Sequence, residues 1–368
     1  MIANICYPER GKLISKAGGA SYGQPPNSNV RRTPLEKTME DLINRIEQAA
    51  SETEFSGVVS IFRDASTVLS KAFGYRDVKN ELANTTDTRF GIASGTKLFT
   101  ALGIGVLINQ GRLSLDTTVG ELDREYRGFV DERATILHLL THTSGIYDYY
   151  DEEVEQDFDQ PHPEIPWASL QTPSDYYPLF KGKAMKFRPG ERYSYSNGGY
   201  VFLGMLIEKL TGRLYRDFVR EHVLQVANMH QSGFYAFNDL PENTANGYLE
   251  DRRTTNINHL PLRGGGDGGM YTTTDDLRAF WDSLLRNRIL SQELTATYLK
   301  THYKRDAARG YGCGIYKRLD DSMFWIVGSD AGVGFDSRYI AADKLTINIL
   351  SNITNGEDAM REVILQHL

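Results

Sequence analysis

A serine and a lysine stand three residues apart at the start of an apolar segment. The sequence reads Ser-Gly-Thr-Lys at 94–97 and stays almost wholly apolar to Gln110, with Gly111 placed as a helix stop. Side chains three residues apart lie on the same face of a helix, so we expect the Lys97 amine to face the Ser94 hydroxyl. Burial lowers the pKa of a lysine, and the neutral amine can then accept a proton from a serine. The pair predicts an enzyme in which Ser94 attacks an ester or amide carbonyl.

A serine at a helix start has a second, ordinary use, which is to cap the helix. The residues after Lys97 favour the catalytic use. Leu98, Phe99 and Leu102 indicate a buried helix, and a lysine is rarely buried without a partner. The helix N-terminus also carries partial positive charge, so the Ser94 N–H can help to hold a developing oxyanion.

Four further motifs accompany this pair. They are Arg-Pro-Gly at 188–190 followed by Tyr195-Ser196-Asn197, Leu-Leu-Thr-His-Thr-Ser-Gly at 139–145, Gly-Gly-Met-Tyr-Thr-Thr-Thr-Asp-Asp-Leu at 268–277, and Tyr-Gly-Cys-Gly at 311–314. Together with Ser-Gly-Thr-Lys they resemble the penicillin-recognising serine enzymes, the superfamily of class C β-lactamases, DD-peptidases and β-lactamase-fold esterases. The resemblance covers the chain from about Phe55 to Ser351.

The resemblance implies a role for each motif residue. Ser94 is the expected acylated nucleophile, Lys97 accepts its proton, and the Ser94 N–H forms one half of the oxyanion hole. Tyr195 is expected to carry the proton to the leaving group, with its phenol pKa lowered by Lys97 and the surroundings. Asn197 is expected to hydrogen-bond both Lys97 and the substrate amide.

The chain departs from the family at its third motif, which is Lys or His, any residue, then Gly, on the strand beside the site. The corresponding stretch, 325–335, has neither Lys nor His. We place the motif at Asp330-Ala331-Gly332, with the Val333 N–H as the second oxyanion donor, and an alternative register starts at Gly328. The family's cation binds the carboxylate of penicillins and peptide C-termini, which an aspartate would repel. We therefore expect a neutral or cationic acyl substrate.

The loop after Gly145 is dense in aromatic and acidic residues. Acidic runs are usually solvated loops. The resemblance places this loop near the mouth of the cleft, so we hypothesise an acidic, aromatic rim that favours amines through charge attraction and cation–π contact. Asp148, Asp151 and Asp330 are the carboxylates on which this hypothesis depends.

Two other patterns have structural interpretations. Residues 264–269 fit G-x-G-x-x-G, but the segment before them is a poor strand, so we expect a close-packed turn under the active site and no nucleotide. His138 and His142 stand four apart, yet Leu139 replaces the Glu of a zinc-protease helix, so we expect no metal and a hydrogen-bonded structural His142. The spacing around Ser94 lacks the G-x-S-x-G elbow of the α/β-hydrolases.

Hydrophobic periodicity predicts the elements that position these residues. A helix begins at Thr33-Pro34, hairpin strands follow at 57–62 and 67–73, strands return at 323–327, 337–340 and 345–350, and a last helix begins at Glu357. We expect an α/β (α+β) fold of the β-lactamase/transpeptidase-like kind. Its antiparallel sheet is built from both chain ends and flanked by helices, and a helical subdomain is added to it.

The expected domain organisation follows from these elements. Residues 1–32, rich in Gly, Ser, Pro and Asn towards their end, form a flexible leader, and 33–368 form a single catalytic domain. Within it we expect a sheet subdomain, about 33–90 and 290–368, and a helical subdomain, about 91–289.

Composition excludes several partners. The 368 residues are 40% hydrophobic and carry a net charge of −7, which argues against nucleic acid or an anionic membrane as a partner. No apolar run is long enough for a membrane span or a secretory signal. The two cysteines imply no disulfide framework, so a cytoplasmic location is expected.

Three functions stay open. The first is a serine hydrolase of esterase, amidase or D-amino-acid peptidase type, acting without a cofactor on a small-molecule or short-peptide acyl substrate. The second is a β-lactamase or a DD-carboxypeptidase of the penicillin-binding kind. The third is a degenerate binding or sensor protein, which the altered third motif favours and the intact Ser94, Lys97, Tyr195 and Asn197 oppose. We favour the first.

Overall fold

The computed structural model describes residues 34–122, 130–154, 157, 159 and 164–367. The expected leader, residues 1–32, lies outside these ranges. Residues 34–40 are helical, and the chain from Asp41 onward forms one compact unit, which contains the sheet and the active site. Our division of this unit into a sheet subdomain and a helical subdomain remains a proposal.

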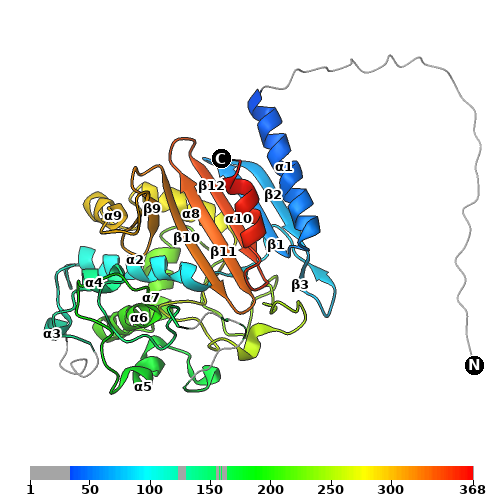
Figure 1. The fold of residues 1–368 in the computed structure, drawn as a ribbon. Helices are drawn as coiled ribbons and strands as arrows, with labels where there is room; N and C mark the ends of the chain where they lie inside the picture. The colour runs from blue at the N-terminus through cyan, green and yellow to red at the C-terminus, as the bar shows by residue number, and fades with distance from the viewer. Residues whose placement is uncertain (1–33, 123–129, 155–156, 158, 160–163, 368) are drawn as a thin grey trace, which may run out of the picture. The chain divides into compact units, whose positions relative to one another are not determined.

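The largest element of this unit is an eight-stranded antiparallel sheet (Figure 1). Its strands, in spatial order, are β2 (Ser66–Phe73), β1 (Gly57–Arg63), β12 (Leu345–Ser351), β11 (Val333–Ile340), β10 (Met323–Asp330), β9 (Tyr316–Arg318), β8 (Arg309–Tyr311) and β7 (Tyr303–Lys304). The N-terminal hairpin pairs with the C-terminal strand through β1 and β12. The prediction of one antiparallel sheet built from both chain ends is confirmed.

Helices cover both faces of the sheet and also form a region of their own beside it (Figure 1). The α-helices of the described residues are α1 (Pro34–Glu52), α2 (Thr96–Asn109), α3 (Val119–Leu122), α4 (Ile136–Leu140), α5 (Tyr177–Phe180), α6 (Asn197–Thr211), α7 (Tyr215–Val219), α8 (Thr274–Leu285), α9 (Gln292–Leu299) and α10 (Asp358–Leu365). Helix α8 packs against β1 and β12 from one side, and α10 crosses the opposite side of the sheet (Figure 1). The remaining strands form two short pairs, β3 (Tyr75–Asp77) with β4 (Leu82–Ala83) and β5 (Phe90–Gly91) with β6 (Tyr271–Thr272).

Helix α2 is buried along most of its length. Its residues are apolar on every side, so it cannot present a solvent face, and residues 96–107 are all buried. The predicted stop is also confirmed, because Gly111 adopts a φ of +69° just beyond the helix. A lysine in the first turn of this helix is therefore surrounded by protein.

The short pair β5–β6 fixes the segment that precedes α2. Gly91 pairs with Tyr271, the Ile92 N–H donates to the Met270 carbonyl at 2.9 Å, and the Met270 N–H donates to Thr96 Oγ1 at 3.1 Å. These bonds hold the turn before Tyr271 against the start of α2.

Among the described residues, no helix is long and apolar enough to cross a membrane.

Candidate active site

Ser94 lies in a single tight turn, residues 93–95, that leads into α2. Ala93, directly before it, has a φ of +42°, a left-handed conformation that non-glycine residues adopt only when their surroundings impose it. The Ser94 side chain caps neither this turn nor α2. Its Oγ instead accepts a hydrogen bond from Lys97 Nζ at 2.8 Å, so the predicted contact is confirmed.

Lys97 has two further acceptors. Nζ donates to Asn197 Oδ1 at 2.7 Å and to the Asp267 carbonyl at 2.8 Å, and the side chain is 2% exposed. Burial lowers its pKa, while the Asp267 and Glu152 carboxylates act in the opposite direction. The site therefore favours the neutral amine more than water does, as a proton acceptor requires.

Tyr195 lies beside the lysine, with Lys97 Nζ 4.9 Å from its ring centroid. The Tyr195 ring also packs on the His142 ring, with 4.4 Å between the ring centroids. Burial raises the pKa of Tyr195 well above its ordinary value, and the Glu152 carboxylate raises it further. The expected lowering of this pKa is wrong, because the phenolate would be formed in an enclosed place next to a carboxylate. Tyr195 is a neutral phenol here.

His142 is a structural residue, as predicted. Its Nδ1 accepts from the Ser196 N–H at 3.0 Å, which leaves the proton on Nε2, 3.1 Å from the Tyr311 hydroxyl. Burial holds the pKa of this imidazole well below its usual range. Among the described residues, no group of three or more His, Cys, Asp or Glu side chains is arranged to hold a metal ion.

Asn197 begins α6 and is oriented from both ends of its amide. Oδ1 faces Lys97, while Nδ2 donates to the Tyr150 carbonyl at 2.9 Å and to Glu152 Oε1 at 3.2 Å. The predicted contact of Asn197 with Lys97 is confirmed. The loop that follows Gly145 is thereby joined to the active site.

The carboxylates of that loop do not form a common rim. Asp148 is 4% exposed and accepts the backbone N–H groups of Asn197 and Gly198 at 2.8 and 2.9 Å, where it anchors the N-terminus of α6. Burial raises the pKa of Asp148 to about 7. Asp151 is paired with Lys186 at 2.6 Å. The expectation that Asp148 lies at the rim is wrong, because the N-terminal amides of α6 bind it inside the protein.

The glycine-rich turn at 264–269 lies under the site, as predicted. A Cβ on Gly264 would lie 2.4 Å from the Gly269 carbonyl oxygen, so the two sides of the turn touch at backbone distance. The turn also supplies a residue that sequence reasoning missed. Asp267 accepts from Lys97 through its carbonyl and from the Tyr149 hydroxyl through Oδ2 at 2.6 Å, and burial raises the pKa of its carboxyl.

Gly328 is the residue of β10 that lies against the nucleophile. A Cβ on it would lie 2.3 Å from the Ile92 carbonyl oxygen and 2.7 Å from the Ser94 nitrogen, whereas Gly332 packs against Gly247 and Tyr248. The glycine of the third motif, as we placed it, therefore lies away from Ser94.

The hairpin formed by β10 and β11 determines where the backbone N–H groups of β10 point. Asp330 pairs with Val333 across a two-residue loop, so these two residues exchange their own backbone hydrogen bonds and the Val333 N–H faces Asp330. Pairing alternates along a strand, so the Ser329 N–H points away from β11. It points to an edge of β10 where the pairing with β9 ends at Trp325. Val333 is thus wrongly placed for the second oxyanion donor, and Ser329 fits that position.

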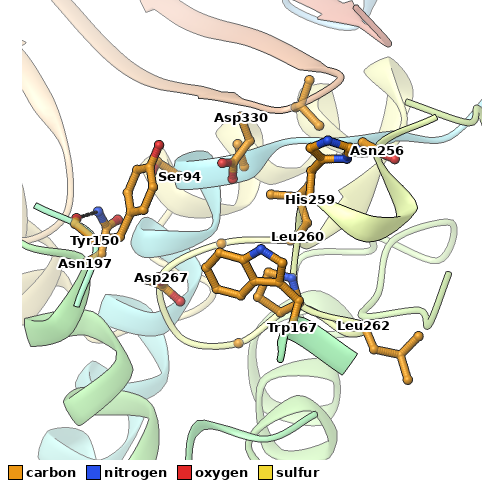
Figure 2. A pocket seen from close by; sticks show the side chains of 18 of the residues that line it. Ser94, Tyr150, Trp167, Asn197, Asn256, His259, Leu260, Leu262, Asp267 and Asp330 are labelled. Atoms are coloured by element: carbon orange, nitrogen blue, oxygen red, sulfur yellow. Dashed lines mark hydrogen bonds between the residues drawn. The ribbon is translucent and has the colours of Figure 1, made fainter. Parts of the chain in front are cut away.

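A pocket of about 880 Å³, counting space open to solvent, adjoins Ser94 (Figure 2). In Figure 2, Ser94 and Asn197 lie on one side, with His259 and Leu260 opposite. Aromatic and apolar side chains form its walls, among them Tyr149, Trp167, Tyr176, Tyr235, Phe237, Leu260 and Leu262.

Three carboxylates, Glu152, Asp267 and Asp330, line this pocket. Burial raises the pKa of Asp330 to about 7, and the Asp267 charge raises it further, while Lys97 opposes them. The structure thus brings Ser94, Lys97, Tyr195, Asn197 and Asp330 to one site.

Comparison with known proteins agrees with this geometry. The Beta-lactamase family model matches residues 42–367. Penicillin-binding protein 4* of Bacillus subtilis is 29% identical over 67% of this chain, and D-aminopeptidase of Brucella anthropi is 29% identical over 76%. The chain spans only about half of these two relatives, 56% and 48% of their lengths. The crystal structure of a penicillin-binding protein from Bacillus halodurans has a TM-score of 0.82 and 33% identity, covering 88% of this chain and all of that one.

Proposed function

This chain belongs to the Beta-lactamase family, and from that membership we propose that it is a serine hydrolase that forms an acyl-enzyme at Ser94. The proposed substrate is an ester or amide whose acyl part carries an amine and an apolar side chain. The observation that carries the substrate class is the pocket beside Ser94, where two aspartates lie among aromatic walls.

The proposed reaction has two stages. In the first, Ser94 Oγ attacks the carbonyl carbon and its proton passes to Lys97 Nζ, which the 2.8 Å contact places in reach. The tetrahedral intermediate then collapses, the bond to the leaving nitrogen or oxygen breaks, and the proton goes to that atom. In the second stage a water attacks the acyl-enzyme, gives its proton to Lys97 and forms the acid. The same proton returns to Ser94 Oγ as the ester bond to the enzyme breaks.

Tyr195 takes part in this scheme as a neutral phenol. Because its pKa is raised, it is protonated at neutral pH and donates a hydrogen bond to the leaving group. It receives a proton only as it passes one on, so no phenolate has to exist in the resting enzyme. Lys97 is left as the base.

Two backbone N–H groups are the proposed oxyanion donors. The Ser94 N–H is one, and the Ser329 N–H on the free edge of β10 is the other. Gly328 permits this arrangement, since any side chain at that position would push β10 away from Ser94.

Charge in the pocket supports the amine-bearing acyl group. Asp267 and Asp330 attract an ammonium group and repel a carboxylate, and the aromatic walls favour an apolar side chain and cation–π contact. The name D-aminopeptidase, borne by one relative, agrees with a substrate that presents a free amine.

Penicillin acylation is a second candidate. It is favoured by the complete set of Ser94, Lys97, Tyr195 and Asn197 together with a relative named a penicillin-binding protein. Asp330 opposes it, because a penicillin carries its carboxylate next to the reacting ring. Stable labelling by a fluorescent penicillin without ester turnover would favour this candidate, or a sensor, over the hydrolase.

The test uses matched substrates that differ by one amine. D- and L-phenylalanine p-nitroanilide are compared with 3-phenylpropionyl p-nitroanilide, which lacks the amine. We expect kcat/KM to be higher for one of the amine-bearing substrates, and Asp330→Asn to lower that preference about tenfold, or about 1.4 kcal/mol.

The matched control is Asp151→Asn, which should keep the preference because Lys186 already pairs with that carboxylate. Ser94→Ala should remove all turnover. A wild-type enzyme that favours the neutral substrate would contradict the amine proposal while leaving the serine chemistry intact.

A further inference from the structure

The tip of the β10–β11 hairpin is bonded to a segment outside the two strands. The Gly332 N–H donates to Thr354 Oγ1 at 2.8 Å, and Ser329 Oγ donates to Glu357 Oε1 at 3.0 Å. Thr354 and Glu357 both lie between the end of β12 and the start of α10. This connecting segment therefore holds the hairpin tip that bears Ser329.

Ser329 lies where the sheet itself gives it little support. Among the described residues, β10 pairs with β9 only at Phe324 and Trp325, and from there to Asp330 it pairs with β11 alone. The Ser329 N–H points to the unpaired edge, so no strand of the described sheet sets its direction on that side. An oxyanion donor has to meet the oxygen at hydrogen-bond distance, and a misplacement of about 1 Å can cost about 10²-fold in rate. A bond to the Ser329 side chain can supply the missing restraint.

The Glu357 carboxylate fills the space that Gly334 leaves open. Gly334 is the partner of Ser329 on β11, and residues paired in this way face the same side of a sheet. A Cβ on Gly334 would lie 2.2 Å from Glu357 Oε2 and 2.9 Å from the Glu357 nitrogen. The carboxylate thus takes the place of a side chain across from Ser329, and any side chain at position 334 would displace it.

This carboxylate is itself buried and held. Glu357 is 2% exposed, and its Oε1 also accepts from Arg361 Nη1 at 3.2 Å, one turn further along the chain. Burial raises the pKa of Glu357 to about 7, while the Arg361 charge and the Ser329 hydroxyl act in the opposite direction. An oxygen of the carboxyl group can accept from Ser329 whether the group is protonated or not. The contact is therefore available over the neutral pH range.

We propose that Glu357 is a positioning residue of the active site, which fixes Ser329 through its hydroxyl and thereby directs the Ser329 N–H to the oxyanion. This inference rests on the proposed function, because it concerns the second oxyanion donor, and it gives the segment before α10 a part in the reaction. The role requires no contact between Glu357 and the substrate. Its loss should therefore lower kcat and leave KM largely unchanged.

The test is a double-mutant cycle on Ser329 and Glu357, with p-nitrophenyl acetate as the substrate. Ser329→Ala removes the hydroxyl and keeps the backbone N–H, whereas Glu357→Ala removes the acceptor. Each should lower kcat about tenfold, which is less than the loss of a whole oxyanion donor. The double variant should be no slower than Glu357→Ala, because both substitutions break the same contact.

Two further variants separate positioning from folding. Glu357→Gln keeps an oxygen that can accept from Ser329 Oγ, so it should retain most of the wild-type kcat. Asp358→Ala is the matched control, because it removes the neighbouring, exposed carboxylate that contacts the same Arg361, and it should retain kcat as well. If Glu357→Ala does not fold, Ser329→Ala and Glu357→Gln decide the question, since both leave the buried space filled.

Several results would overturn the inference. They are wild-type kcat in Ser329→Ala, losses that add up in the double variant, a rise in KM at unchanged kcat, and a loss in Glu357→Gln as large as that in Glu357→Ala or Ser329→Ala. In each of these cases, wild-type turnover that Ser94→Ala abolishes would leave the proposed function standing. If wild type shows no hydrolysis that depends on Ser94, the proposed function and this inference both fail.

Discussion

The helical wall of the active site and its β10 wall differ in how their polar groups are bonded. On the helical wall, Lys97 and Asn197 have their acceptors and donors matched inside the protein. On the β10 wall, the Asp330 carboxylate makes no hydrogen bond to another side chain of the described residues, and burial raises its pKa to about 7. The proton apparatus is thus organised before a substrate arrives, whereas the β10 wall is left for the substrate to complete.

The largest effect should come from breaking the helical wall. Lys97→Ala removes the group that accepts the Ser94 proton, so we expect kcat/KM for a p-nitrophenyl ester to fall about 10⁴-fold, as for other enzymes that lose one member of a catalytic set. The rate of Ser94 labelling by a fluorophosphonate should fall in parallel. Partial rescue by added ethylamine would show that the missing amine, and not misfolding, is the cause. A loss of less than tenfold would remove Lys97 from the role of base.

A smaller effect is expected where β10 approaches the helix. Gly328→Ala places a Cβ 2.3 Å from the Ile92 carbonyl oxygen, so β10 must move away from Ser94 and one oxyanion donor moves with it. We expect kcat to fall about 10²- to 10³-fold. Gly91→Ala is the control, since its Cβ would meet nothing closer than Val333 Cγ2 at 3.4 Å. Wild-type kcat in a folded Gly328→Ala enzyme would contradict the placement of the oxyanion hole.

The smallest effect is a pH dependence of substrate preference. With a pKa of about 7, Asp330 is mostly protonated below that pH and loses its attraction for an ammonium group. The ratio of kcat/KM for the amine-bearing and the neutral anilide should therefore fall several-fold as pH drops from about 8 to about 6, while a substrate α-amine stays largely protonated over most of that range. Taking the ratio cancels the titration of Lys97. Asp330→Asn should flatten the curve, and a wild-type ratio that does not change with pH would exclude Asp330 from amine recognition.

Contacts between neighbours in sequence were the predictable part of the site. Ser94 and Lys97 meet because a helix places residues three apart on one face. The contact of Asn197 with Lys97 spans 100 residues and was expected only from the resemblance to the family. Five of the eight sheet strands were likewise predicted, since β1, β10 and β12 are apolar and β-branched. The short strands β7, β8 and β9 were not predicted.

The rest depends on how distant segments meet. The carbonyl of Asp267 bonds Lys97 from 170 residues away, and a backbone acceptor leaves no sign in the sequence. Nothing in the sequence distinguishes Asp148 from other loop aspartates, because its role depends on the distant N–H groups at the start of α6 that its carboxylate accepts. The position of the third motif was mistaken because the β10–β11 loop has only two residues, which brings Gly328 and not Gly332 to Ser94.

The three acceptors around Lys97 also fix the direction of its lone pair. An ammonium group has three N–H bonds and a neutral amine has two, yet Nζ faces Ser94 Oγ, Asn197 Oδ1 and the Asp267 carbonyl in either form. Neither the amide oxygen nor the carbonyl can donate a hydrogen, since the Asn197 NH₂ is turned to Tyr150. Only the hydroxyl can. The two hydrogens of the neutral amine are therefore used by Asn197 Oδ1 and the Asp267 carbonyl, and its lone pair points at the Ser94 hydroxyl. The number of donors and acceptors around Nζ thus determines the route of the proton as much as the pKa values do.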